Sequence, residues 1–254
     1  MFHFDQKRDK KARDLLFSYR KSFPIEPLLR EIEDELRKKQ KTPLFFGAGP
    51  NLETLVKKYL HILLSQSGNF FIVSADGATN CLLKYDIMPD IVCSDLDGIS
   101  LLQLEKVLGI NQGLGIKKER GEKIPLFLIH AHGDNIDKLN EFSSILKREN
   151  RIIGTTQVKP KIPIINPGGF TDGDRGLYFC HYLCPINRPF WLFGYDFEGK
   201  IGKFSKNKFN QSVPLSKLKK KKLNFAKELI GFLQNKMKRK VIYIPDEEFK
   251  PQIN

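Results

Sequence analysis

The chain has 254 residues, 41% of them hydrophobic and 28% charged, which excludes a wholly disordered protein and is enough to bury a full core. No apolar run approaches the roughly 18 residues of a membrane span, and the charged opening does not resemble a signal peptide, so we expect a cytoplasmic protein without a membrane partner. The net charge of +14 invites a nucleic-acid-binding role, but residues 43–198 are nearly neutral, with 16 basic and 17 acidic side chains, and the surplus lies at the two ends.

The first 42 residues are predicted to form a helical extension. Leu28, Ile32 and Leu36 recur at helical spacing among charged residues, which indicates an amphipathic helix. We expect residues 43–254 to form a single α/β domain.

Four segments between residues 43 and 146 repeat one theme, a short apolar strand followed by a helix-like stretch: PLFFGAGPNLETLVKKYL, NFFIVSADGATNCLLKYD, PDIVCSDLDGISLLQLEKVL and PLFLIHAHGDNIDKLNEFSSIL. This alternation predicts βαβ units, and therefore a mostly parallel, Rossmann-like sheet with helices on both faces. Right-handed crossovers bring the C-terminal ends of all the strands to one edge, where open α/β sheets bind their ligands. The residues that follow each predicted strand are therefore candidates for a functional site.

The first of these turns contains Gly47, Gly49, Pro50 and Asn51. Its bare backbone could approach a phosphate beside the N-terminus of the next helix. The turn matches neither the GxGxxG dinucleotide pattern nor a P-loop, and an ordinary strand-to-helix turn has a similar composition. Alone, it is weak evidence for a nucleotide site.

Carboxylates follow the next two predicted strands, with Asp76 after one and Asp95 and Asp97 after the other. If the second strand persists to its end, Asp95 and Asp97 point to the same side of the sheet. Two such charges repel each other unless a cation lies between them, and carboxylate oxygens suit Mg²⁺. Helix capping would explain one acid at each junction, but it explains the pair poorly.

The HAHGDN segment resembles the beginning of a dinuclear zinc site. Such sites need further histidines beside the aspartate and downstream, and the rest of the chain holds only three others, so we do not favour a zinc hydrolase. We interpret His130 as a buried strand residue. We expect His132, near Asp134, to contact a phosphate or a metal-bound water.

The segment GGFTDGDRG places Thr171, Asp172, Gly173, Asp174 and Arg175 before a predicted helix. Arg175 could bind phosphate oxygens through two hydrogen bonds, and the helix N-terminus would add its dipole. The alternative is a salt-bridged helix start in which one of the two aspartates is the cap.

The remaining predicted elements are a strand in FWLFGYDF that ends at Tyr195 and Asp196, a helix and a last strand in VIYIP. Within PLSKLKKKKLNFAKELIGFLQNKM, Leu215, Leu218, Ala226, Leu229, Ile230 and Leu233 predict the packed face of the helix. Lys219 to Lys222 are predicted to form its solvated side. Residues 199–254 carry 15 basic and 4 acidic side chains, which attract polyanions without specificity, so we expect no specific nucleic-acid partner.

Taken together, ADGATNCLLKYDIMPDIVCSDLDG, HAHGDN, GGFTDGDR and FGYDFEGKIGKFS closely resemble the archaeal 6-hydroxymethyl-7,8-dihydropterin pyrophosphokinase (MptE-like) family. That family is similar to the catalytic domain of thiamin pyrophosphokinase. The resemblance spans about residues 43–230 and implies a Mg²⁺-dependent transfer of pyrophosphate from ATP to the hydroxymethyl group of a reduced pterin, releasing AMP. This reaction belongs to the biosynthesis of folate-like or methanopterin-like cofactors.

The resemblance also implies roles for individual residues. Asp76, Asp95 and Asp97 would hold Mg²⁺. The residues expected to bind ATP are Gly47, Gly49, Pro50, Asn51, His132, Thr171, Asp172, Gly173, Asp174 and Arg175. As a hypothesis, Arg175 stabilises the charge that develops on phosphate, Asp134 takes the proton of the acceptor hydroxyl, and Asp196 contacts the substrate.

Two other functions stay open at this point. A sugar-nucleotide-dependent glycosyltransferase of related fold would use the same acids, and a nucleic-acid-binding module would use the basic ends. We expect small-molecule partners, ATP and a reduced pterin, and leave open a homodimer.

Overall fold

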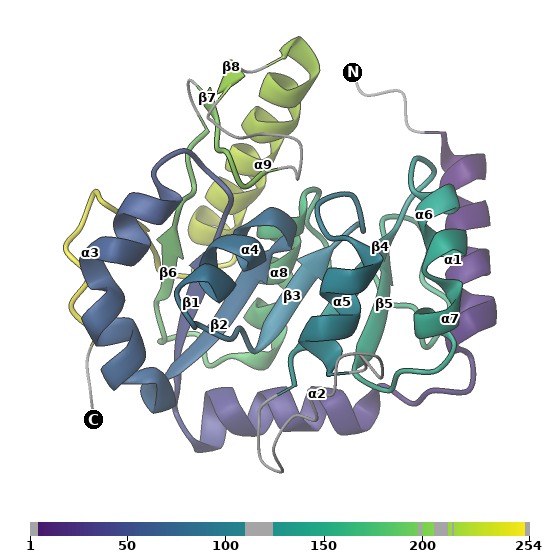
Figure 1. Cartoon of the computed structure of the whole chain (residues 1–254), viewed down its shortest axis with the longest axis horizontal. Coiled ribbons are helices and arrows are strands. Elements are labelled where there is room, and N and C mark those ends of the chain that lie inside the picture. The colour runs from purple at the N-terminus through teal and green to yellow at the C-terminus, as the bar shows by residue number, and fades with distance from the viewer. Residues whose placement is uncertain (1–4, 110–123, 198–199, 206–212, 215, 252–254) are drawn as a thin grey trace.

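The computed structural model describes residues 5–109, 124–197, 200–205, 213–214 and 216–251. Its centre is a seven-stranded sheet with the order β5-β4-β3-β2-β1-β6-β9, in which every pair of neighbouring strands is parallel (Figure 1). The strands are β1 (Thr42–Phe46), β2 (Phe70–Ala75), β3 (Ile91–Ser94), β4 (Leu126–Ala131), β5 (Ile152–Thr156), β6 (Phe190–Phe193) and β9 (Val241–Ile244). Two short strands, β7 (Lys200–Ile201) and β8 (Val213–Pro214), form a separate antiparallel pair.

Helices cover both faces of the sheet, as predicted. They are α1 (Gln6–Arg20), α2 (Glu26–Glu33), α3 (Leu52–Ser65), α4 (Asp76–Lys84), α5 (Leu101–Leu108), α6 (Ile136–Glu141), α7 (Ser143–Leu146), α8 (Asp172–Leu183) and α9 (Lys217–Asn235). A π-helical stretch, Asp34–Lys38, continues α2, and a 3-10 turn, Ser67–Asn69, precedes β2. No helix of the described ranges is long and apolar enough to cross a membrane.

The alternation of side chains along each strand divides the core into two layers. In β1, Phe45 packs with residues of α2, α8 and α9, whereas Leu44 and Phe46 pack with α3 and α4 on the other face. These three side chains have no exposed surface. Strands that are buried on both faces read as continuous apolar runs, which explains why they were easy to predict.

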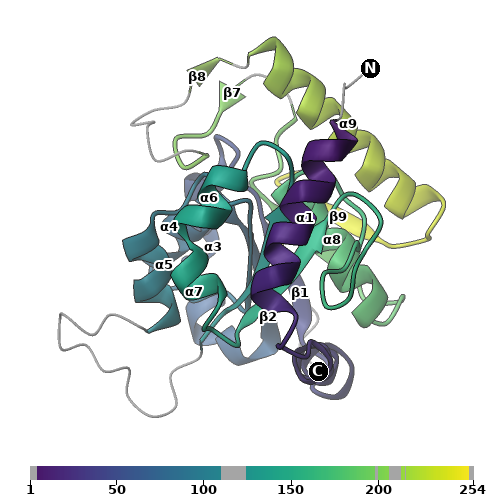
Figure 2. The same ribbon diagram turned by 90° about the vertical axis from the view of Figure 1, so that its right-hand side faces the viewer.

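The N-terminal helix α1 packs against the β4–β5 side of the sheet beside α6 (Figure 2). Ala12 and Leu16 are fully buried there. The guanidinium of Arg20 is also buried and donates to the backbone carbonyls of Leu146 and Ile152 at 2.9 and 2.8 Å. These contacts fix α1 on the sheet and place its first turn beside the loop after β4.

Two expectations about strands were wrong. Strand β5 was not predicted, because its apolar run is only Ile152 and Ile153 before a glycine and two threonines. Strand β6 ends at Phe193, two residues before the predicted end. Gly194 has a positive φ of 70°, and a Cβ there would lie 2.3 Å from the carbonyl oxygen of Gly47, so the backbone leaves the sheet at this glycine.

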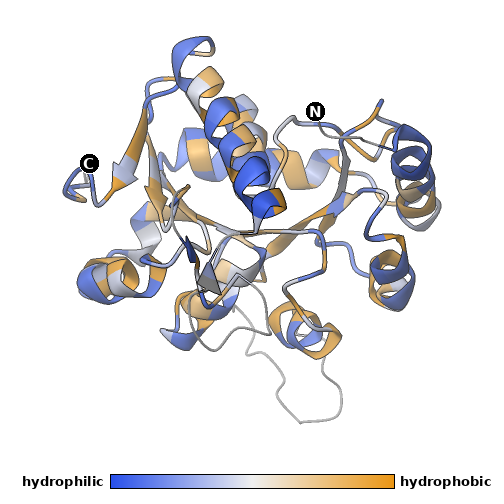
Figure 3. Cartoon of the chain, turned by 90° about the horizontal axis from the view of Figure 1, so that it is seen from above, coloured by the Kyte–Doolittle hydropathy of each residue, from blue (hydrophilic) through white to orange (hydrophobic). Residues whose placement is uncertain are grey.

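The strand order explains where a ligand site can form. From β1 the chain proceeds outward through β2, β3 and β4 to β5, and then returns to the other side of β1 for β6 and β9. Loops diverge where the order reverses, and this opens a crevice at the C-terminal ends of the strands. Helix α9 lies beyond those ends in Figure 1, and in the view from above it crosses over the sheet (Figure 3).

Candidate active site at the C-terminal edge of the sheet

A cavity of about 930 Å³ lies at this edge. Its lining comes from the loops after β1, β2, β3, β4 and β6, from the first turn of α8, and from parts of α1, β7 and α9. The volume is within the usual range for small-molecule sites, roughly 300–1,000 Å³. The lining divides into a cluster of carboxylates, an apolar wall and a group of lysines.

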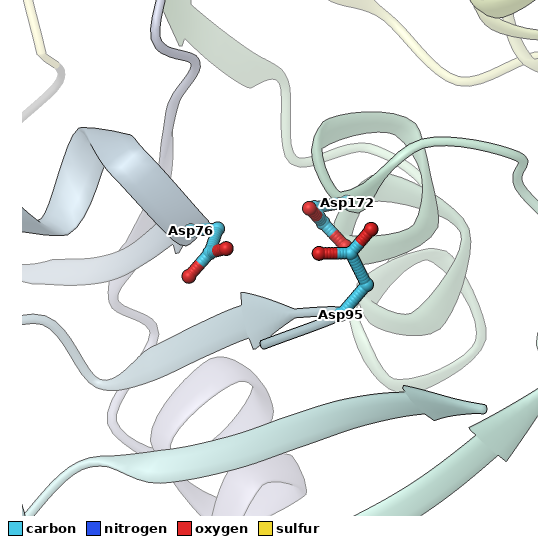
Figure 4. A group of neighbouring side chains, drawn as sticks. All are labelled: Asp76, Asp95 and Asp172. Atoms are coloured by element: carbon cyan, nitrogen blue, oxygen red, sulfur yellow. The ribbon is translucent and has the colours of Figure 1, made fainter. Parts of the chain in front are cut away.

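The carboxylates of Asp76, Asp95 and Asp172 point toward one another (Figure 4). One oxygen from each lies within 4.8 Å of the others. Asp76 is the first residue of α4, Asp95 follows β3, and Asp172 is the first residue of α8, so the sheet topology brings together three distant segments. We call these residues the carboxylate cluster.

Burial and mutual repulsion change the proton affinity of the cluster. Burial, and then the charge of Asp95, raises the pKa of Asp76 to about 8. Burial, followed by Asp95 and Asp76, raises the pKa of Asp172 well above its ordinary value. For Asp95, burial acts in the same direction, but hydrogen bonds from His132 and the backbone of Asp97 outweigh it and lower the pKa. A cluster of this kind would exchange protons for a divalent cation.

Asp76 is held by donors from the neighbouring loop. Its carboxylate accepts hydrogen bonds from the hydroxyl of Ser94 at 2.8 Å and from the backbone N–H of Gly98 at 2.6 Å. A Cβ at position 98 would lie 2.6 Å from the Asp76 carboxylate, so any other residue there would displace either the loop or the acid. These contacts orient Asp76 before any ligand binds.

The structure groups Asp172, and not Asp97, with Asp76 and Asp95. The prediction for Asp97 assumed that β3 persists past Asp95, but the strand ends at Ser94 and Leu96 is buried with a φ of 70°. That premise is wrong. Asp97 is exposed and lines the cavity, and its backbone N–H donates to Asp95 at 3.1 Å.

His132 contacts the cluster directly, as its Nε2 lies 3.4 Å from the Asp95 carboxylate. Its Nδ1 accepts from the backbone N–H of Asp134 at 3.3 Å, which assigns the ring proton to Nε2. The Asp134 side chain is 77% exposed at the rim of the cavity, 3.7 Å from Arg8. It lies outside the carboxylate cluster.

Two residues that the sequence did not single out hold the loop after β4. The side-chain amide of Asn135 donates to the backbone carbonyls of Asp95 and His130 at 2.8 and 2.6 Å. The buried carboxylate of Asp9, from α1, accepts from the backbone N–H of Gly133 at 2.7 Å. An asparagine directly after Asp134 was the only signal for the first, and no local pattern identifies the second.

The two aspartates in the first turn of α8, Asp172 and Asp174, have different roles. Asp174 is buried, accepts from the backbone N–H groups of Phe170 and Thr171 at 2.6 and 2.7 Å, and also binds the Thr171 hydroxyl. Thr171 is thus the N-cap of α8, and Asp174 completes a capping box from the third helical position, so neither aspartate is itself the cap that the sequence left open. Thr171, Asp172, Gly173 and Asp174 all line the cavity.

Arg175 does not face the cavity, which contradicts its predicted role as a phosphate ligand. Its side chain is fully buried and donates to the backbone carbonyls of Gly168 and Gly169, each at 3.2 Å. It also lies 3.1 Å from Nε2 of His130, a buried imidazole whose pKa burial and Arg175 lower well below its ordinary value. Arg175 therefore fixes the loop that leads into Asp172.

The glycine turn after β1 is also partly structural. Gly47 and Gly49 line the cavity, but their N–H groups donate to the carbonyls of Phe193 and Gly194 at 2.8 and 2.9 Å. These two donors are thus engaged by β6 and its loop, and the expectation that they bind phosphate does not fit this arrangement. Neither Pro50 nor Asn51 is among the described residues that line the cavity.

An apolar wall forms another part of the lining. It consists of Phe170, Tyr195, Phe197, Leu223 and Ala226. The Tyr195 hydroxyl donates to the carbonyl of Gly173 at 3.1 Å, and half-buried Asp196, between Tyr195 and Phe197 in the sequence, also belongs to the cavity lining. A planar heterocycle could pack here and still reach a hydrogen-bond acceptor.

Lysines line the cavity from α9, which corrects the prediction that Lys219 to Lys222 form a solvated side. Lys219 and Lys222 are half-buried and belong to the lining, while Lys220 is exposed and lies outside it. Lys221 is exposed and also reaches the cavity, as does Lys200 of β7.

On the packed side of α9, Ala226, Ile230 and Leu233 are buried as predicted. Leu229 is half-buried, and Leu218 is 59% exposed. Leu215 lies outside the described residues.

Comparisons with known proteins give one consistent result. The model of the family described as 6-hydroxymethylpterin diphosphokinase MptE-like matches residues 17–201. The chain is 37% identical over 200 residues to a protein of Pyrococcus furiosus, a match that covers 78% of this chain and 74% of the relative. For a Methanocaldococcus jannaschii protein the identity is 31% over 249 residues, covering 93% and 91%. A Methanothermobacter thermautotrophicus protein is 33% identical over 192 residues, covering 75% and 73%. All three are named 6-hydroxymethyl-7,8-dihydropterin pyrophosphokinase.

Proposed function

The chain belongs to the MptE-like 6-hydroxymethylpterin diphosphokinase family, and we propose that it transfers pyrophosphate from ATP to the hydroxymethyl group of 6-hydroxymethyl-7,8-dihydropterin, releasing AMP. The observation that carries the proposal is the carboxylate cluster in a cavity that also has the apolar wall. The proposal includes a place in folate-type or methanopterin-type cofactor biosynthesis and a cytoplasmic location.

The carboxylate cluster has the donor chemistry for Mg²⁺. Its ligands are hard carboxylate oxygens, and oxygens bound to one Mg²⁺ at roughly 2.0–2.1 Å lie at most about 4.2 Å apart. The three oxygens of the cluster lie within 4.8 Å of one another, so they would have to draw closer together to share one ion. We propose that Asp76, Asp95 and Asp172 hold the ion, which when bound offsets charge on the ATP phosphates.

The residues of the chain then act mainly by positioning. His132 orients Asp95, while Ser94 and Gly98 orient Asp76, so the acids that receive the ion are preorganised. The apolar wall fits a pterin ring, and Asp196 supplies an acceptor for the ring N–H groups. Phosphoryl transfer of this kind depends on positioning and charge and needs little covalent help from the protein.

The direct test is the coproduct of the reaction. Purified protein with ATP, Mg²⁺ and 6-hydroxymethyl-7,8-dihydropterin is expected to form AMP and the pterin diphosphate in equal amounts, measured by chromatography. ADP as the coproduct, or no turnover at saturating Mg²⁺, would contradict the proposal. Hydrolysis of a nucleotide sugar under the same conditions would favour the glycosyltransferase instead.

A further inference from the structure

One face of α9 supplies positive charge, which the proposed reaction needs and the carboxylate cluster does not provide. Lys219 and Lys222 lie three residues apart and therefore on the same side of the helix. Ala226 and Ile230 continue this side by further helical turns; they are 2% and 0% exposed, and both line the cavity. The buried positions thus fix the rotation of α9 and direct the two lysines inward. We call Lys219 and Lys222 the lysine face.

The charge of the cavity explains why such a face is needed. Asp76, Asp95 and Asp172 are joined in the lining by Asp97 and Asp196, so an anionic triphosphate meets several carboxylates there. A divalent cation offsets only part of this charge, and further cations must meet the remaining phosphate oxygens. Lysine is suited to this because its ammonium group is a mobile point charge with three donors.

We propose that α9 is a phosphate-binding helix, in which Lys219 and Lys222 bind the triphosphate of ATP while the carboxylate cluster holds its metal ion. The inference takes its ligand from the proposed function. It gives a role to the basic C-terminal segment, which lies beyond residues 17–201, the part matched by the family model. It also replaces Arg175, whose two terminal nitrogens donate to loop carbonyls, as the source of positive charge.

The chain provides a matched control for this proposal. Lys217 and Lys220 belong to the same helix and are also three residues apart, but both are exposed and outside the cavity lining. The experiment compares Lys219→Gln/Lys222→Gln with Lys217→Gln/Lys220→Gln in the full chain. The two variants lose the same charge from the same helix and differ only in the side that loses it.

The measurement is binding of the non-hydrolysable analogue α,β-methylene ATP with Mg²⁺, by calorimetry, together with urea unfolding of each variant. We expect the dissociation constant to rise roughly 10- to 100-fold for the inner pair and less than about threefold for the outer pair. Lys219→Arg/Lys222→Arg is expected to retain most of the binding, because the charge is kept. If the inner double variant does not fold, the single variants Lys222→Gln and Lys220→Gln give the same comparison.

Equal losses in the two pairs would show an effect of net charge alone and overturn the proposal, as would unchanged binding by the inner pair. Failure of the unmodified protein to bind the analogue would overturn it too. Binding is measured without turnover, so a protein that shows the expected difference but forms no AMP with the pterin would support the lysine face and contradict the proposed function.

Discussion

The carboxylate cluster and the lysine face line the same cavity but are built in different ways. The cluster takes one residue each from the segments at Asp76, Asp95 and Asp172, and the parallel sheet must bring all three together. The lysine face comes from a single turn of one helix and depends only on how α9 is rotated. A cluster that shares one ion should therefore fail when any member is lost, whereas a row of cations should weaken step by step.

The largest effect should come from breaking the cluster at Asp95. Asp95→Asn removes a charge that the metal ion needs but keeps the shape of the side chain, so we expect kcat/KM to fall by roughly 1,000-fold, about 4 kcal/mol of transition-state stabilisation. The fold should be retained, with a modest fall in the free energy of unfolding, because hydrogen bonds from His132 and the Asp97 backbone favour the charged form of Asp95 in the folded state. Steady-state kinetics and urea unfolding check both parts.

Asp97→Asn is the matched control, since Asp97 is two residues away but exposed and outside the cluster. We expect it to lower kcat/KM about tenfold or less, and Asp172→Asn to resemble Asp95→Asn. If Asp97→Asn and Asp95→Asn lowered kcat/KM equally and Asp172→Asn changed it little, the metal site would be the one predicted from the sequence, which includes Asp97 and not Asp172.

A second prediction tests whether Arg175, a buried cation, stabilises the fold and does not bind phosphate, in contrast to the lysine face. Arg175→Lys keeps the charge but removes the planar fork that serves the carbonyls of Gly168 and Gly169. We expect the free energy of unfolding to fall by about 3 kcal/mol, since a buried charge loses part of its hydrogen bonding. Denaturant unfolding measures this. If Arg175 were a phosphate ligand, stability would be retained and only ATP affinity would fall.

These contrasts show what the sequence could and could not predict. The alternation of strands and helices indicated a parallel sheet, and that topology alone predicted that acids from separate strands would meet at one edge. The spacing of Asp95 and Asp97 could not reveal that β3 stops at Ser94 and that Leu96 turns into the core. The partner from α8 was therefore assigned to ATP and not to the cluster.

The lysines show a different limit. Lys219 to Lys222 cover a whole turn of helix, so the charge pattern does not favour one side over another. Only the packing of Ala226 and Ile230 reveals that Lys219 and Lys222 lie on the buried side of α9. Likewise, an arginine in a glycine-rich loop has the same pattern whether its donors bind a ligand or the carbonyls of the loop.

A third prediction concerns Glu53, an acid that the fold pairs with two lysines. Glu53, in the first turn of α3, accepts from Lys84 at 2.7 Å and from the Tyr85 hydroxyl at 2.8 Å, and it also pairs with Lys203 of the segment after β7. The hydrogen bonds from Lys203 and Lys84 lower its pKa from 4.5 to about 2. Because the folded state binds the proton more weakly than the unfolded state, this contribution is complete above pH 4.5 and is lost as the pH falls toward 2.

Glu53→Gln should therefore lower the free energy of unfolding by about 1–2 kcal/mol at pH 7, allowing for solvent screening, and by progressively less toward pH 2. Urea unfolding over this range measures the difference between the two proteins. A constant difference at every pH would show that packing, and not the ion pairs, accounts for the loss.

The smallest effect is expected at Asp134, an acid that belongs to neither the carboxylate cluster nor the lysine face. This acid lines the cavity but is 77% exposed, pairs with Arg8 at 3.7 Å and lies outside the cluster. An exposed pair of this kind contributes little, so we expect Asp134→Asn to change kcat/KM less than fivefold, under about 1 kcal/mol. If Asp134 instead took the proton of the pterin hydroxyl, kcat would fall by roughly 100-fold or more. A loss of that size would mean that the site extends from the cluster to the rim, and that α1, which supplies Arg8, is part of the catalytic surface.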